Sequence, residues 1–175
     1  MIKNLLLTGP PGCGKTTLVR RIVQDLGDLP VAGFYTDEIR EGGERTGFAL
    51  TSLDGKRGIL SHVNFRGPAR VGRYRVNIAG FESFLQDVRP GEPGLRLMVI
   101  DEIGKMECFS GRFRQLVGEC LGSPVPFLAT IALRGTPAIE QVKVRSDVKV
   151  ITMSREDREE EFRRVLEEVR RLVGK

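Results

Sequence analysis

The sequence predicts an α/β domain of three layers, in which a mostly parallel central sheet lies between helices and carries an antiparallel hairpin insertion over residues 31–63. Two observations predict it. Apolar runs of strand length alternate with amphipathic segments along most of the chain, and this alternation is interrupted once by short runs separated by glycine turns. At 175 residues, 40% of them hydrophobic, the chain is long enough for one domain, which we expect to span residues 1–175.

The first strand and the first helix lie at the N-terminus. Residues 4–8 are an apolar run that predicts a buried strand. Residues 18–26 place Leu, Val and Ile at the spacing of one helix face, and Gly27 is expected to end that helix. The segment between them is short, so the strand turns directly into the helix.

Residues 31–63 have a different pattern, because their apolar residues come in short alternating runs. The pairs Gly42-Gly43 and Asp54-Gly55 separate these runs and are typical of hairpin turns. We therefore expect consecutive antiparallel strands here, and we expect this insertion to cover part of the functional site.

The second half of the chain returns to alternating strands and helices. Three apolar runs predict strands: Leu95 to Ile100, Pro126 to Leu133 and Val148 to Thr152. The second of them is almost uninterrupted in its apolar character, as expected of a parallel strand that is buried on both faces. Helices are expected at three places: residues 81–88, after a cap at Ser110, and after a start resembling a capping box at Ser154 to Asp157.

A glycine-rich phosphate loop, G-P-P-G-C-G-K-T, joins the first strand to the first helix at Gly9 to Thr16. The unpaired N–H groups and the dipole of a helix N-terminus attract an anion, and a nucleotide phosphate fits that position. Lys15 can reach the β- and γ-phosphates, and the Thr16 hydroxyl can bind Mg²⁺. We expect the nucleotide to be bound by Gly9, Pro10, Pro11, Gly12, Cys13, Gly14, Lys15, Thr16 and Thr17.

A second motif follows the apolar strand that begins at Leu97, where the chain reads L-M-V-I-D-E, the form of a Walker B motif. Side chains at the carboxyl end of a parallel strand enter the crevice where α/β sheets bind ligands. We expect Asp101 to bind Mg²⁺ together with Thr16, and Glu102 to orient the water that attacks the γ-phosphate. Glu102 and Lys15 are thus the expected catalytic residues.

Residues near the second motif leave alternatives open. Asp101 to Gly104 also spell D-x-x-G, as in GTPase switch regions, but the chain has no Asn-Lys-x-Asp guanine clamp, so we expect weak discrimination among bases. Lys105 and Glu107 could be groups at the edge of the site, although an exposed ion pair is the favoured interpretation. Thr130 could sense the γ-phosphate or simply be buried and hydrogen-bonded.

Arginines could neutralise charge on a transferred phosphoryl group. Arg134 is one candidate for this role, and a cluster of four others is a second: Arg66, Arg70, Arg73 and Arg75. A solvated loop is the favoured interpretation of the cluster. Whether an arginine comes from these positions or from another subunit stays open at this stage.

Composition and charge exclude several function classes. The net charge of +5 would permit nucleic-acid binding, but most arginines alternate with acids, only 6% of residues are aromatic and none is Trp, so a nucleic-acid partner is not expected. The three cysteines have no metal-site or disulfide spacing. No apolar run is long enough to cross a bilayer and the chain begins directly with its first strand, so we expect a cytoplasmic protein without a membrane partner. A monomer is also expected.

Several motifs together resemble the nucleoside-triphosphatase family of thermophilic bacteria and animals, the cancer-related nucleoside triphosphatase type. They span nearly the whole chain: G-P-P-G-C-G-K-T-T-L from Gly9, G-F-Y-T-D-E-I-R from Gly33, T-G-F-A-L from Thr46, R-V-G-R-Y-R-V-N from Arg70, D-E-I-G-K-M-E from Asp101 and A-T-I-A-L-R-G from Ala129. The resemblance implies a P-loop NTPase sandwich of RecA-like or kinase-like topology.

The resemblance also implies a reaction: Mg²⁺-dependent hydrolysis of ATP, GTP, CTP and UTP to the diphosphate and phosphate, with little preference among bases. Hydrolysis is the leading hypothesis, with slow turnover. A small-molecule or nucleoside kinase with the same fold is the main alternative, in which the hairpin insertion and the arginine cluster would form an acceptor site. An ATPase stimulated by RNA or a protein partner ranks third.

Overall fold

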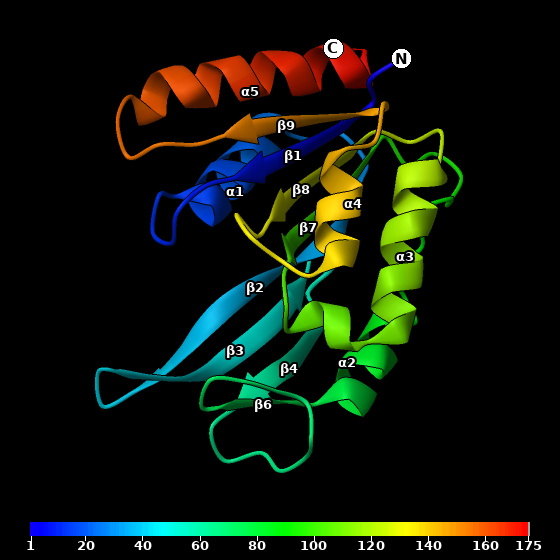
Figure 1. Cartoon of the computed structure of the whole chain (residues 1–175). Coiled ribbons are helices and arrows are strands. Elements are labelled where there is room, and N and C mark those ends of the chain that lie inside the picture. The colour runs from blue at the N-terminus through cyan, green and yellow to red at the C-terminus, as the bar shows by residue number, and fades with distance from the viewer. Residues whose placement is uncertain (175) are drawn as a thin grey trace.

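The structure, a computed structural model, describes residues 1–174, so Lys175 lies outside the described residues. Its centre is one nine-stranded sheet with the strand order β5-β6-β4-β3-β2-β7-β8-β1-β9 (Figure 1). The strands are β1 Asn4–Thr8, β2 Val31–Glu41, β3 Glu44–Ser52, β4 Arg57–His62, β5 Arg70–Val71, β6 Tyr74–Val76, β7 Leu97–Ile103, β8 Phe127–Ile131 and β9 Val148–Thr152. The helices are α1 Lys15–Asp25, α2 Ile78–Leu85, the 3₁₀ helix η1 Glu107–Phe109, α3 Gly111–Gly122, α4 Pro137–Lys143 and α5 Arg158–Val173.

The sheet has a parallel half and an antiparallel half. Strands β2, β7, β8, β1 and β9 pair in parallel, whereas β2, β3, β4, β6 and β5 pair antiparallel. The predicted α/β class, the parallel strands and the hairpins of residues 31–63 are confirmed. The hairpins are continuous with the main sheet, however, because residues 31–35 of β2 pair in parallel with β7 and residues 34–41 pair antiparallel with β3.

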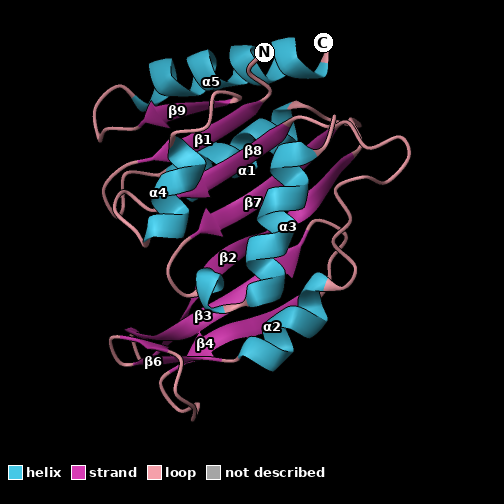
Figure 2. Cartoon of the chain, turned by 45° about the vertical axis from the view of Figure 1, so that its right-hand side comes forward, coloured by secondary structure: helices cyan, strands magenta, loops and turns pink. Residues whose placement is uncertain are grey.

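Helices cover both faces of the sheet, which gives the three predicted layers (Figure 2). On one face, α1 and α5 pack on alternate residues of β1, β7 and β8, such as Leu5, Leu7 and Val99. On the other face, α2, α3 and α4 pack on the intervening residues, such as Leu6 and Ile100. Residues buried on both faces are expected of parallel strands in the middle of an α/β sheet.

An aromatic cluster joins the antiparallel half to the helical layer. Phe34 of β2 is fully buried and makes edge contacts with Phe84 of α2 at 5.5 Å, Phe81 of α2 at 6.1 Å and Phe113 of α3 at 6.4 Å between ring centroids. Edge-to-face geometry at these separations is favourable for aromatic rings. The outer strands are therefore anchored by the same core that holds α2 and α3.

Two helices differ from the sequence prediction. Helix α2 begins at Ile78 rather than residue 81, because the side chain of Asn77 accepts a hydrogen bond from the N–H of Gly80 and caps it. Helix α4 was not expected from the sequence. It is only seven residues long and begins with a proline. Among the described residues, no helix is both long and apolar enough to cross a membrane.

The predicted capping box of the last helix is also wrong. Helix α5 begins at Arg158, after Asp157, whose side chain makes no capping hydrogen bond. Ser154 instead bonds locally to Glu156, and its N–H donates to the Glu161 carboxylate at 2.9 Å. The Ser154 side chain and the Glu156 backbone therefore form a turn ahead of the helix, and Arg155 in that turn contacts the loop after β1.

Candidate active site

The phosphate loop lies between β1 and α1, where the sequence placed it. Gly12 and Gly14 have φ of +74° and +97°, a region that favours glycine. At Gly9, a Cβ would lie 2.7 Å from the carbonyl oxygen of Met153 and 2.9 Å from Cys13 Sγ, so the loop could not pack against the end of β9 with a side chain there. The glycines thus hold the loop in a compact form in front of the N-terminus of α1.

The N-terminus of α1 has the features of an anion site. Gly14 is its N-cap and supplies no side chain to bond the first N–H groups of the helix. Those groups and the helix dipole therefore face the loop, where an anion can be bound. Lys15 Nζ lies over the same loop, donating to the carbonyl of Gly9 at 3.1 Å and that of Pro10 at 3.5 Å. Cys13 is fully buried beneath the loop and fills the space there.

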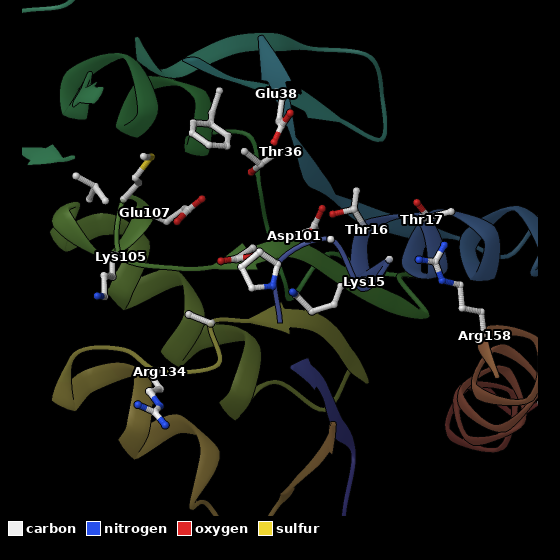
Figure 3. Close-up of a pocket in the computed structure, with 18 residues that line it drawn as sticks. Lys15, Thr16, Thr17, Thr36, Glu38, Asp101, Lys105, Glu107, Arg134 and Arg158 are labelled. Carbon is white, nitrogen blue, oxygen red and sulfur yellow. The ribbon is translucent and has the colours of Figure 1, made fainter. Parts of the chain in front are cut away.

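Asp101 lies in β7 beside the loop, and only 2% of it is exposed. The Thr130 hydroxyl of β8 donates a hydrogen bond to its Oδ1, while Oδ2 is buried and has no hydrogen-bond partner among the described residues. Burial raises the pKa of this carboxyl group, whereas interactions with Thr130, Thr16, Arg20 and Lys15 lower it. The structure therefore brings Asp101 and Thr16 together, as expected from the two motifs (Figure 3).

The donor set around Asp101 fits Mg²⁺. The unpartnered Oδ2 and the Thr16 hydroxyl are hard oxygen ligands, and Mg²⁺ is usually bound by one or two such groups together with water and substrate phosphates. The described residues contain no group of three or more His, Cys, Asp or Glu side chains able to hold a metal by themselves. A site here would need the nucleotide to complete it.

Glu102 follows Asp101 in β7 and is half-buried at the wall of the same cavity. Burial is the main cause that raises the pKa of its carboxyl group, the charge of Asp101 raises it further, and the charge of Lys15 lowers it. A carboxylate of raised basicity, with a lysine close enough to influence it, is suited to accept a proton from water.

The cavity in front of these groups has a volume of about 610 Å³. Its near wall is the phosphate loop with Asp101, and its far wall is formed by the hairpin strands and the segment after β7. Residues from the far wall and the rim include Thr36, Glu38, Phe48, Val71, Lys105, Met106, Glu107, Ala132, Arg134 and Arg158. The expectation that the hairpins cover part of the site is consistent with this wall.

One residue near the motifs, Glu107, differs from the favoured interpretation. Glu107 is only 5% exposed and lines the cavity, so the expected exposed ion pair with Lys105 is wrong, while Lys105 itself is exposed at the rim. Thr130 is buried and bonded to Asp101, as the second of its two interpretations expected, and it lies behind the carboxylate. The segment that carries the four clustered arginines reaches the cavity through Val71, which is one of its lining residues.

Two arginines that the sequence interpretation did not single out contact the phosphate loop. Arg155 Nη2 donates to the Pro11 carbonyl at 3.2 Å. The Arg158 guanidinium lies 3.8 Å from the position that a Cβ on Gly14 would take, and Figure 3 shows it reaching toward Thr17. Neither residue belongs to a local motif, because both reach the loop from the segment after β9, the strand that pairs with β1.

The fold and the site together define a P-loop nucleotide-binding protein: a parallel sheet with a phosphate loop after its first strand and an aspartate on the strand two positions away. Comparison with known proteins agrees with this class. A family model described as NTPase matches residues 4–166. The chain therefore belongs to the nucleoside-triphosphatase family, as its motifs indicated.

Relatives within this family match nearly the whole chain. The human cancer-related nucleoside-triphosphatase is 43% identical over 174 residues, covering 90% of this chain and 92% of the relative. The nucleoside-triphosphatase THEP1 of Thermotoga petrophila is 40% identical, covering 93% of this chain and 90% of the relative. The crystal structure of THEP1 from Aquifex aeolicus matches with a TM-score of 0.81 and 34% identity, over 95% of this chain and 98% of that one.

Proposed function

We propose that the protein hydrolyses nucleoside 5′-triphosphates to the diphosphate and phosphate, in a slow, Mg²⁺-dependent reaction with broad base specificity that includes ATP, GTP, CTP and UTP. The observation that supports this proposal is the buried, unpartnered Oδ2 of Asp101 beside the phosphate loop, with Glu102 next in sequence at the cavity wall. The names of the relatives agree with hydrolysis in general.

Each residue of the site has a proposed role. The amides from Gly9 to Thr17 hold the phosphates. When the nucleotide binds, Lys15 gives up its hydrogen bonds to the loop carbonyls and donates to the β- and γ-phosphates instead. Thr16 and Asp101 hold Mg²⁺, which when bound neutralises charge on the phosphate oxygens. Glu102 orients a water molecule and accepts its proton as the water oxygen bonds to the γ-phosphorus and the bond from that phosphorus to the bridging oxygen breaks.

Broad base specificity and slow turnover are proposed on separate grounds. The chain lacks an Asn-Lys-x-Asp guanine clamp, so we propose that the phosphates and the metal supply most of the binding energy. An arginine in contact with the transferred phosphoryl group adds about 10³ to 10⁵ in rate. Arg134 lines the cavity but is exposed at its rim, which supports a slow basal reaction.

Release of inorganic phosphate without any acceptor tests the proposal. We expect release from ATP, GTP, CTP and UTP at rates within about tenfold of each other, because the base contributes little to discrimination. Chelation of Mg²⁺ should abolish release. Strict dependence on an added nucleoside or other acceptor would instead favour the kinase alternative, and stimulation by RNA that falls steeply with salt would favour the third hypothesis.

Loss of the hydroxyl behind Asp101 should weaken metal binding. Replacing Thr130 with Val removes the donor to Asp101 Oδ1 at nearly constant volume, and changes to groups that orient a ligand typically lower metal affinity about 10–100-fold. The Mg²⁺ concentration for half-maximal activity should rise by that factor. Thr152→Val, on an exposed position of β9, is the matched control and should leave the Mg²⁺ requirement unchanged.

We also propose that the protein acts as a cytoplasmic monomer, with residues 1–175 as one domain and no nucleic-acid partner. Many arginines are held in ion pairs on the surface, for example Arg21 with Glu159, Arg145 with Asp147 and Arg170 with Asp25. A paired guanidinium is less available to a nucleic-acid phosphate. The molar mass measured by light scattering during size-exclusion chromatography would test this, and the mass of a dimer would contradict it.

A further inference from the structure

Glu107 is a buried carboxyl group that has no role in the reaction as proposed above. It is the first residue of η1, directly after the segment that leaves β7, and only 5% of it is exposed. It nevertheless lines the same cavity as Lys15, Asp101 and Glu102. A buried acid at this position must either have a partner or keep its proton, because an isolated buried charge is strongly unfavourable.

Gly104 brings Glu107 and Glu102 close to each other. A Cβ on Gly104 would lie 2.8 Å from Glu107 Oε2 and 2.9 Å from Glu102 Oε1. The two carboxyl oxygens therefore approach one point from either side, over backbone that carries no side chain. Gly104 has no positive φ, so its backbone does not require glycine, and the space between the two carboxyl groups is what its missing side chain provides.

The charges around Glu107 are mainly negative. Burial raises the pKa of its carboxyl group to about 8, the charges of Glu102 and Asp101 add to the rise, and backbone N–H groups of Glu107 and Gly104 oppose it. The neighbouring Cys108 is a thiol whose own pKa burial raises to about 11. From α3, Arg114 donates to the Cys108 carbonyl at 2.6 Å.

Burial distinguishes the two glutamates. Glu107 is only 5% exposed, whereas Glu102 is half-buried at the cavity wall. Among the described residues, none of the main causes acting on the pKa of Glu107 is a cation. A carboxyl group enclosed in this way keeps its proton, because its charged form is poorly solvated. Glu107 is therefore the protonated member of the pair.

We propose that Glu107 is a positioning residue for hydrolysis, which holds a proton and donates a hydrogen bond, directly or through one water molecule, that keeps the Glu102 carboxylate turned toward the attacking water. This role rests on the proposed function of Glu102. If Glu107 lost its proton, two negative charges would face each other across Gly104 and the Glu102 side chain would be driven out of position.

Two variants at position 107 separate a hydrogen-bond role from a packing role. Glu107→Gln keeps a neutral donor of the same length, so we expect kcat within about fivefold of wild type. Glu107→Leu fills the space without a donor, so we expect kcat to fall about 50-fold or more while KM changes little. Glu167→Gln, at an exposed position of α5, is the matched control and should behave like wild type.

The pH profile gives a readout that a packing role would not change. In wild type, kcat should decline above about pH 8 as Glu107 loses its proton. In Glu107→Gln this alkaline decline should be absent or displaced to higher pH. In the range between the ordinary pKa of 4.5 and about 8, native Glu107 keeps a proton that the unfolded chain releases, so wild-type stability falls as pH rises, and Glu107→Gln should gain thermal stability relative to wild type over that range.

The outcomes separate this proposal from the proposed function. If Glu107→Gln and Glu107→Leu have the same kcat and the alkaline decline persists in Glu107→Gln, the positioning role is wrong. If Glu102→Gln retains full hydrolysis, the proposed function of Glu102 is wrong instead. Should Glu107→Leu fail to fold, Gly104→Ala decides: its methyl group enters between the two carboxyl groups, so kcat should fall with nucleotide binding retained, and unchanged kcat would overturn the proposal.

Discussion

Replacing Glu102 with Gln is expected to lower turnover by about 10³-fold while nucleotide binding stays within about threefold of wild type, since general-base groups typically contribute 10² to 10⁴. The amide keeps the length and shape of the side chain but cannot accept the proton of the attacking water. The phosphate loop, Lys15 and Asp101 remain in place, and these groups supply most of the proposed binding.

Phosphate release under single-turnover conditions, together with titration of a fluorescent nucleotide analogue, would measure the two effects separately. Glu92→Gln is a suitable control, because Glu92 lies in an exposed loop outside the active-site cavity. Full hydrolysis in Glu102→Gln would refute its role. Loss of both binding and turnover would mean instead that the carboxylate supports the loop or the metal site.

Replacing Gly33 with Ala is expected to destabilise the fold by more than about 3 kcal/mol, the range of severe steric substitutions. Gly33 pairs with Val99 between β2 and β7 and has φ of +132°. A Cβ there would lie 1.7 Å from the Val99 carbonyl oxygen and 2.7 Å from its carbonyl carbon. The strands would have to separate, and β7 is the strand that carries Asp101 and Glu102.

Denaturant unfolding would measure this loss, with Gly55→Ala as the control. Gly55 also has a positive φ, +96°, but a Cβ on it would meet no atom within 4 Å. Its substitution should therefore show only the backbone strain, about 1–2 kcal/mol. Equal losses in the two variants would show that backbone strain, rather than the close approach of Val99, accounts for the need for glycine at position 33.

The parts of the fold that the sequence predicted well depend on local patterns. The phosphate loop, β1 and α1 follow from glycine positions and helical spacing within one continuous segment, and the structure has them at the expected residues. Asp101 was recognisable because it ends an apolar run. The two motifs meet because parallel strands of one sheet have their carboxyl ends at the same edge.

The parts that could not be predicted depend on contacts between distant segments. Residues 31–35 read as the start of a separate hairpin, yet they join the parallel sheet because β7, more than sixty residues later, provides a partner. Glu107 reads as a surface residue in a charged stretch, and only the folded structure shows that it is buried at the cavity wall. Arg155 and Arg158 reach the phosphate loop through the tertiary fold alone.

The continuity of β2 restricts how the protein can move. This one strand runs from the parallel half of the sheet, beside β7, into the antiparallel hairpins that form the far wall of the cavity. Hinge closure needs a few loop residues that absorb a large change of backbone angles, and a hydrogen-bonded strand is not such a segment. We therefore expect the cavity to adjust through its side chains and its connecting loops, rather than by rotation of two rigid lobes.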